Sequence, residues 1–435
     1  MPGRSTVAAG PGGLSRARDQ SLGEDHVAVT SNRRWPVLCV LALIVASDYK
    51  FRLRADDQTI AGNADPFVLL EIALYGLVAG FLFVRFRPTT RVRRANLLTL
   101  LGFAYAFVLA GSALYSPYLQ LALVRGTQVL VVLALSRSLA RHCNLADLHR
   151  IAHGYIVLLA GSVVFGVVVP FPQLPTQAGR FTWLYVHPVQ AGEMLAIAVV
   201  LLAGYVVTIA LDRSGPRWQL PVYLVLLAIC GGGLLATQTR GAVIGAIVGA
   251  VVVVWTRWRG QRKVEAGVVA AVALIAVALT SSSAIESFFA RGESLQRLAT
   301  LNSRTDLWGY AFQLFPQHPV YGFGLTASRG LFLDVIGLGG GHNALVNLLM
   351  DTGIVGSLVW LALLAVILLG AARIPRGRAG VQADRGMILA LTLAMIANSV
   401  FTEGLGAPAN VACTWLFVIV AWLNLAAVPA EGGRP

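Results

Sequence analysis

Arginine and histidine residues at the boundaries of apolar segments are the side chains of this sequence best suited to chemistry. Arg240 closes the stretch 237–240 and opens an apolar segment. The free N–H groups of a helix N-terminus attract anions, and an adjacent guanidinium adds to that attraction. The plainer interpretation is a helix-end arginine that extends its charge to the membrane surface. His342 follows three glycines and precedes a helical segment, and an ordinary histidine pKa of about 6.5 suits proton transfer.

Arg304 is a third candidate, because it lies in the first turn of a predicted helix. A cation at that position opposes the helix dipole, so an anionic partner is expected. Asp306 or Glu293 could supply that partner within the protein, and a bound anion could supply it from outside.

Arg125 and Arg180 complete the set of candidate arginines. Arg125 lies within an apolar segment, where a charge is costly and faces a cavity or a partner. It could bind substrate, or it could pair with Glu193 or Glu403. Arg180 is either a contact for an anion or a solvated loop residue. Because arginine forks match phosphate oxygens, these residues favour a phosphate-bearing substrate.

The sequence gives little support for a metal or a nucleotide cofactor, and we expect neither. His149 and His153 are four residues apart, which is a spacing found in metal sites, and Asp147 is near. No fourth ligand follows them, and no Walker loop, Asp-x-Asp or His-Glu-x-x-His motif is present. The four cysteines form no paired motif.

The elements that position these residues are predicted to be membrane-spanning helices. The 435 residues are 57% hydrophobic and only 12% charged, whereas a soluble domain carries roughly 25% charged residues. The net charge of +14 does not indicate a nucleic-acid partner, because the basic residues cluster in short loops. No segment shows the alternation of a membrane β-barrel, so the fold class is an all-α polytopic membrane protein.

The apolar runs predict about twelve transmembrane helices. Residues 1–34 are predicted to be a disordered cytoplasmic tail, 35–284 to hold helices 1–9, 353–428 to hold helices 10–12, and 429–435 to be a second cytoplasmic tail. The first run, 35–47, is short, and a signal peptide is its alternative. The predicted spans are 35–47, 67–86, 95–115, 118–138, 151–169, 188–211, 219–236, 240–256, 266–284, 353–371, 386–402 and 409–428.

The distribution of basic residues predicts which side each loop faces. Most of the 34 Lys and Arg residues fall on the side of the N-terminal tail when the segments alternate. The positive-inside rule then makes both termini cytoplasmic and the long loop 285–352 extracytoplasmic. In that loop, Ser303 and Asp306 resemble a helix cap, and Pro316 ends the helix. A short amphipathic or re-entrant helix is predicted over 342–350, closed by Asp351-Thr352-Gly353.

Several motifs, taken in order, resemble the O-antigen ligase superfamily of bacterial lipid-linked glycan ligases and polymerases. They cover residues 170–425 and comprise Gly179-Arg180-Phe181, His187-Pro188, Thr239-Arg240-Gly241-Ala242, Ser303-Arg304 with Trp308, His318-Pro319-Val320-Tyr321-Gly322-Phe323-Gly324, His342-Asn343-Ala344-Leu345, and Asp351-Thr352-Gly353-Ile354-Val355-Gly356. The family more often has Asn after the His-Pro pair and Glu at the position of Asp351.

The resemblance implies transfer of a glycan from undecaprenyl pyrophosphate to an acceptor hydroxyl on the outer face of the cytoplasmic membrane. The acceptor would be a glycolipid, a polysaccharide or a protein. Arg240 and Arg304 would hold the pyrophosphate, and His342 would be the general base or would orient the hydroxyl. The expected substrate contacts are Arg180, Arg125, Asn343 and Tyr321.

Two alternative functions are consistent with the sequence. A repeat-unit polymerase of the same family uses the same chemistry on another acceptor. A transporter or flippase of lipid-linked glycans would also need many spans and an arginine-lined cavity, but it would not need the long loop and would often show two similar halves.

Overall fold

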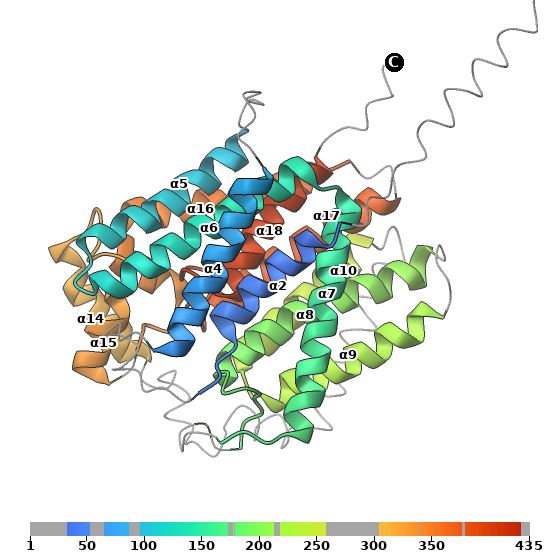
Figure 1. The fold of residues 1–435 in the computed structure, drawn as a ribbon, viewed down its shortest axis with the longest axis horizontal. Helices are drawn as coiled ribbons and strands as arrows, with labels where there is room; N and C mark the ends of the chain where they lie inside the picture. The colour runs from blue at the N-terminus through green and yellow to red at the C-terminus, as the bar shows by residue number, and fades with distance from the viewer. Residues whose placement is uncertain are drawn as a thin grey trace, which may run out of the picture. The chain divides into compact units, whose positions relative to one another are not determined.

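The computed structural model describes residues 33–52, 65–86, 96–172, 177, 179–212, 218–257, 304–337, 339–375 and 379–427. Within these ranges all regular elements are helices, as the composition predicts (Figure 1). They are α2 (Trp35–Asp48), α4 (Pro66–Arg85), α5 (Leu97–Ser112), η1 (Ala113–Tyr115), α6 (Leu119–His142), α7 (Leu145–Val168), α8 (Pro188–Asp212), α9 (Gln219–Ala236), α10 (Arg240–Arg257), α14 (Arg304–Leu314), η3 (Phe315–Gln317), α15 (Ala327–Ile336), α16 (Ala344–Arg373), α17 (Ala379–Ser399) and α18 (Val411–Ala426).

Eight helices in the described part of the chain are long and apolar enough to cross a membrane. They are α4 to α10 and α16, with η1 continuing α5, and they coincide with predicted spans. The predicted spans 35–47 and 409–428 correspond to the shorter apolar helices α2 and α18. The predicted span 386–402 overlaps α17, and 266–284 lies outside the described residues. The prediction of twelve spans is therefore supported only in part.

The centre of the bundle is built around α18 and α8, and α10 and α17 make the most extensive helix pair. Nearly every residue of α18 is buried, including Trp415 and Trp422. The helices α4 and α9 bury few residues and expose large apolar side chains such as Leu77 and Val225. Exposed apolar surface on helices of this length fits a lipid environment, in which these side chains need no protein cover.

The helix α16 is broken close to its start. Its backbone leaves helical geometry at Gly353, where φ is 63° and ψ is −160°. This break coincides with the end predicted for the short helix that follows His342. The first part of α16 packs against α14, and Leu307, Ala311 and Met350 are buried between them.

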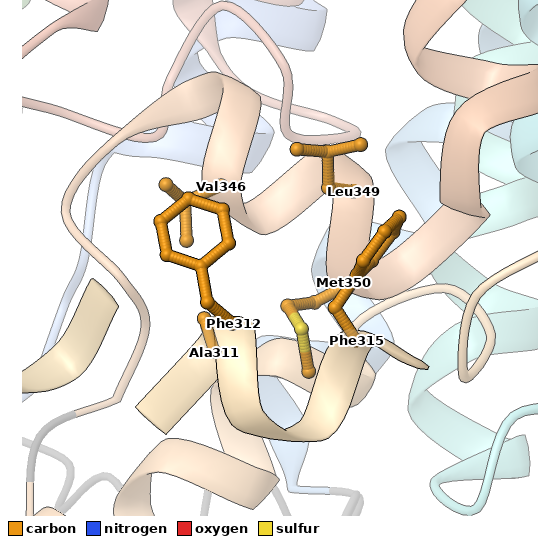
Figure 2. Close-up of a pocket in the computed structure, with 6 residues that line it drawn as sticks. All are labelled: Ala311, Phe312, Phe315, Val346, Leu349 and Met350. Carbon is orange, nitrogen blue, oxygen red and sulfur yellow. The ribbon is translucent and has the colours of Figure 1, made fainter. Parts of the chain in front are cut away.

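The contact between α14 and α16 also leaves a small apolar pocket. Figure 2 shows that Phe312 of α14 and Phe315 of η3 project towards Val346, Leu349 and Met350 of α16. The apolar side chains on one face of α14 therefore hold this helix against the N-terminal turns of α16. As a result, α14 is attached to the helix that begins next to His342.

Candidate functional site

Arg180 holds the turn that leads into Arg240. Its Nε donates to the Thr237 carbonyl oxygen at 2.9 Å, and its Nη2 donates to Thr239 Oγ1 at 3.0 Å. The Thr239 hydroxyl in turn donates to the Pro188 carbonyl oxygen at 2.9 Å. Burial, and then the charge of Arg240, lowers the pKa of Arg180 to about 10. Two guanidinium groups thus lie close together where α8 and α10 begin, and their like charges repel.

His187 stands immediately before α8, with part of its side chain exposed to solvent. Its Nδ1 accepts a hydrogen bond from the Val189 N–H at 3.2 Å. Desolvation by the surrounding protein, followed by the charges of Arg180 and His342, lowers the pKa of His187 to about 4. The low pKa and the accepting Nδ1 both describe a neutral imidazole that carries its proton on Nε2. His187 therefore presents a neutral donor near Arg180 and His342.

His342 lies in a turn with a left-handed backbone conformation, at a φ of 48°. A residue with a side chain adopts this conformation at a cost that the surrounding structure must offset. Two contacts fix the turn. The Gly341 carbonyl oxygen accepts a hydrogen bond from Trp308 Nε1 of α14 at 2.9 Å, and Asn343 caps the N-terminus of α16.

Glu403, between α17 and α18, faces the same turn. Its Oε1 lies 2.5 Å from Arg329 Nη2 of α15, and its Oε2 accepts a hydrogen bond from Asn347 Nδ2. Asn347 Oδ1 accepts the Gly341 N–H at 2.7 Å. Gly340 has a φ of 122° and approaches so closely that a Cβ there would lie 2.2 Å from Glu403 Oε2. Only glycine tolerates both this positive φ and this close approach to Glu403.

The two residues that follow α17 join the segment of His342 to the segment of Arg240. Asn343 Nδ2 donates to the Val400 carbonyl oxygen at 3.2 Å. The next residue, Phe401, packs against Gly241, where a Cβ would lie 2.6 Å from the Phe401 Cβ. The segments that carry the candidate histidine and arginine therefore meet at residues 400–401.

The structure describes Arg304 as the first residue of α14, and its side chain lies outside the described part. The predicted cap residue Ser303 lies outside it as well. Trp308 stands one helical turn after Arg304, so both positions lie on the same face of α14.

Two other expected substrate contacts, Arg125 and Arg180, form bonds within the protein. Arg125 forms an ion pair with Glu71 at 2.7 Å, rather than with Glu193 or Glu403. Half-buried Arg180 braces a turn instead of extending into solvent.

Tyr321 lies elsewhere on the fold, between η1, which continues α5, and the break of α16 at Gly353. Its carbonyl oxygen accepts a hydrogen bond from the Tyr115 hydroxyl at 2.6 Å, and the two rings pack edge to face. Asn343 also has a structural role, because its Oδ1 caps α16 by accepting the N–H groups of Leu345 and Val346.

Sequence reasoning missed the residues that support His342, namely Glu403, Arg329 and Asn347. Asp351, which the motif comparison noted, accepts hydrogen bonds from the N–H groups of Thr326 and Ser328 at the start of α15. A carboxylate and an arginine in two predicted outer loops were visible in the sequence, but nothing in it paired residues 74 positions apart.

His149 and His153 lie at the other end of the bundle in a cluster with Tyr205, Tyr223 and Asp384. His149 Nδ1 lies 3.0 Å from the Tyr205 hydroxyl, and its Nε2 lies 3.0 Å from Asp384 Oδ1. His153 Nε2 lies 2.6 Å from the Tyr223 hydroxyl, and the His153 and Tyr205 rings stack. Among the described residues, no group of three or more His, Cys, Asp and Glu side chains is placed to hold a metal ion.

These features define a class of protein, a multi-spanning helical membrane protein with arginines and histidines gathered at one end. Residues 222–361 match the family model described as O-antigen ligase. A 153-residue stretch, 34% of this chain and 34% of the relative, is 30% identical to an O-antigen ligase of Pseudomonas aeruginosa. The match thus spans about a third of that relative's length. Together the two matches confirm the resemblance to the O-antigen ligase superfamily.

Proposed function

We propose that this protein is a glycan ligase of the cytoplasmic membrane. It would move a glycan from undecaprenyl pyrophosphate to the hydroxyl of a glycolipid, polysaccharide or protein acceptor. The observation that carries this proposal is the convergence of Arg180, Arg240, His187 and His342 at one end of the bundle. The charge distribution of the sequence supports an extracytoplasmic position for this end and cytoplasmic termini.

The paired guanidinium groups suit a pyrophosphate. The like charges of Arg180 and Arg240 repel each other. An anion that accepts hydrogen bonds from both guanidinium groups would relieve this repulsion. It would also accept hydrogen bonds from the N–H groups at the start of α10. Arg304 would add a third guanidinium from α14, which Trp308 attaches to the turn of His342. Fixed positive groups of this kind stabilise the charge that develops on a pyrophosphate leaving group.

His342 is assigned the proton transfer in this reaction. Its imidazole would take the proton of the acceptor hydroxyl as the oxygen attacks the anomeric carbon. The bond from that carbon to the pyrophosphate oxygen breaks, and its electron pair leaves with the pyrophosphate. A single displacement of this kind inverts the anomeric configuration. His187, neutral and carrying its proton on Nε2, would donate a hydrogen bond to the sugar or the pyrophosphate.

A polymerase of the same superfamily would share this chemistry. The description of the matched family and the name of the curated relative both favour a ligase. In a deletion strain, we expect loss of surface glycan with the lipid-linked polymer retained. Accumulation of single repeat units would identify a polymerase instead.

The test of the anion site uses purified full-length protein and a lipid-linked donor. We expect Arg240→Lys and Arg304→Lys each to lower kcat/KM by about 10² or more, because a point charge cannot replace the planar fork at a phosphate. Arg150→Lys is the matched control, since Arg150 pairs with Asp147 at the start of α7. Turnover near that of the unmodified protein in both test variants would refute direct contact with the phosphates.

A further inference from the structure

Glu403 is a carboxylate at the centre of the candidate site to which the family motifs assign no role. It belongs to the connection between α17 and α18, and it lies beside the turn of residues 340–342. Burial by itself would raise the pKa of Glu403, but the charges of Arg329 and His342, together with the hydrogen bonds from Arg329 and Asn347, hold it below the ordinary value. Glu403 is therefore ionised near neutral pH and interacts electrostatically with His342.

The contacts of Glu403 restrain the backbone that carries His342. Oε2 receives Asn347 Nδ2, and the Oδ1 of the same amide receives the Gly341 N–H at 2.7 Å. Glu403, Asn347 and Gly341 thus form a continuous chain of hydrogen bonds that ends one residue before His342. On the other oxygen, Arg329 fixes the direction of the carboxylate. The left-handed conformation of His342 is held by this chain and by Trp308.

The electrostatic interaction has a direct consequence for proton transfer. When a histidine takes up a proton as a general base, a nearby carboxylate stabilises the resulting imidazolium. The arginines of the site act in the opposite direction, because they repel a second positive charge. A negative group facing His342 is therefore most useful where several guanidinium groups surround the reacting atoms.

We propose that Glu403 is the positioning residue of His342, fixing the turn through Asn347 and stabilising the protonated imidazole. This inference rests on the proposed function, since it assumes that His342 takes up a proton during transfer. Glu403 remains ionised throughout and exchanges no proton itself. Among the residues that the structure describes, the charged and titratable side chains that face it are Arg329 of α15, His342 before α16, His187 before α8, Glu193 of α8 and Asp351 of α16.

The experiment compares Glu403→Gln with the unmodified protein in the transfer assay across pH. We expect kcat to fall on the order of tenfold to a hundredfold, less than the loss of about 10²–10⁴ for removing the base itself. We also expect the rising limb of the kcat/KM profile to move to lower pH by about one unit, because a neighbouring negative charge has been removed. Asp334→Asn, which neutralises an exposed carboxylate of α15, should change neither quantity.

A second variant should shift the rising limb of the kcat/KM profile in the opposite direction. Arg329→Gln removes the cation paired with Glu403 and leaves the carboxylate in place. The rising limb should then move to higher pH, and this measurement also serves if Glu403→Gln does not yield folded protein. A merely structural ion pair would lower the thermal stability of both variants without moving either limb.

The outcomes separate this inference from the proposed function. Loss of activity in His342→Ala together with opposite limb shifts in the two other variants supports the positioning role. Loss of activity in His342→Ala with unmoved limbs overturns the role of Glu403 and leaves the proposed function intact. Full activity in His342→Ala overturns the base assignment and, with it, the role of Glu403.

Discussion

Two pairs of histidines lie at opposite ends of this helix bundle, and each has a carboxylate nearby. His149 and His153 stand in regular helix, and each of their four ring nitrogens has a hydrogen-bonding partner. His187 and His342 stand outside the helices, beside Arg180 and Arg240, and His342 holds a strained backbone conformation. Both pairs could be suspected of function from residue type alone.

The hydrogen bonding and backbone conformation of the two pairs distinguish a structural histidine from a functional one. Ring nitrogens that are all satisfied by neighbouring helices bind those helices together, and they leave nothing to offer a ligand. A strained turn that is held by several separate contacts indicates that a particular side-chain position is maintained. The end with His342 is therefore the candidate site, and the end with the His149–His153 cluster is a structural junction.

The largest expected effect comes from removing the site histidine. We expect His342→Ala to lower kcat in the transfer assay by about 10²–10⁴, the usual contribution of a positioned general base. The matched control is His153→Ala, which removes a histidine from the structural junction. It should lower the thermal stability and leave the activity per folded molecule within about twofold of the unmodified protein. Equal losses of activity in the two variants would contradict the assignment of the site to the His342 end of the bundle.

Much of this contrast could be predicted from the sequence, and the unpredicted part has a physical cause. The length of the apolar runs predicts helices such as α8, and the glycines before His342 predict a turn. Which helices become neighbours depends on packing that no local pattern encodes. Arg125 therefore pairs with Glu71, which the sequence did not indicate, because α6 packs against α4. The position of Glu403 was hidden for the same reason.

The turn of His342 can be disturbed without changing a chemical group. Gly340→Ala places a Cβ against Glu403 Oε2 at a φ of 122°. Gly337→Ala also places alanine at a positive φ, of 75°, but in the milder left-handed helical region, and a Cβ there meets open space. We expect the first variant to lower kcat about tenfold or more by displacing the turn, and the second to keep most of its activity. Kinetics of both purified variants test this, and similar activities would show that the approach of Gly340 to Glu403 does not matter.

The smallest effect on activity is expected at the structural junction. Asp384 accepts a hydrogen bond from Trp422 Nε1 at 2.9 Å and lies 3.0 Å from His149 Nε2. Asp384→Ala leaves the buried Trp422 Nε1 and the partly exposed His149 ring without this acceptor, at a cost of about 1–3 kcal/mol of folding free energy. We expect a lower melting temperature in detergent, while the exposed Asp334→Ala should change it little. Transfer activity per folded molecule should persist in Asp384→Ala, since α17 carries the junction at one end and the site at the other. Loss of activity without loss of thermal stability would mean that the His149–His153 cluster takes part in function.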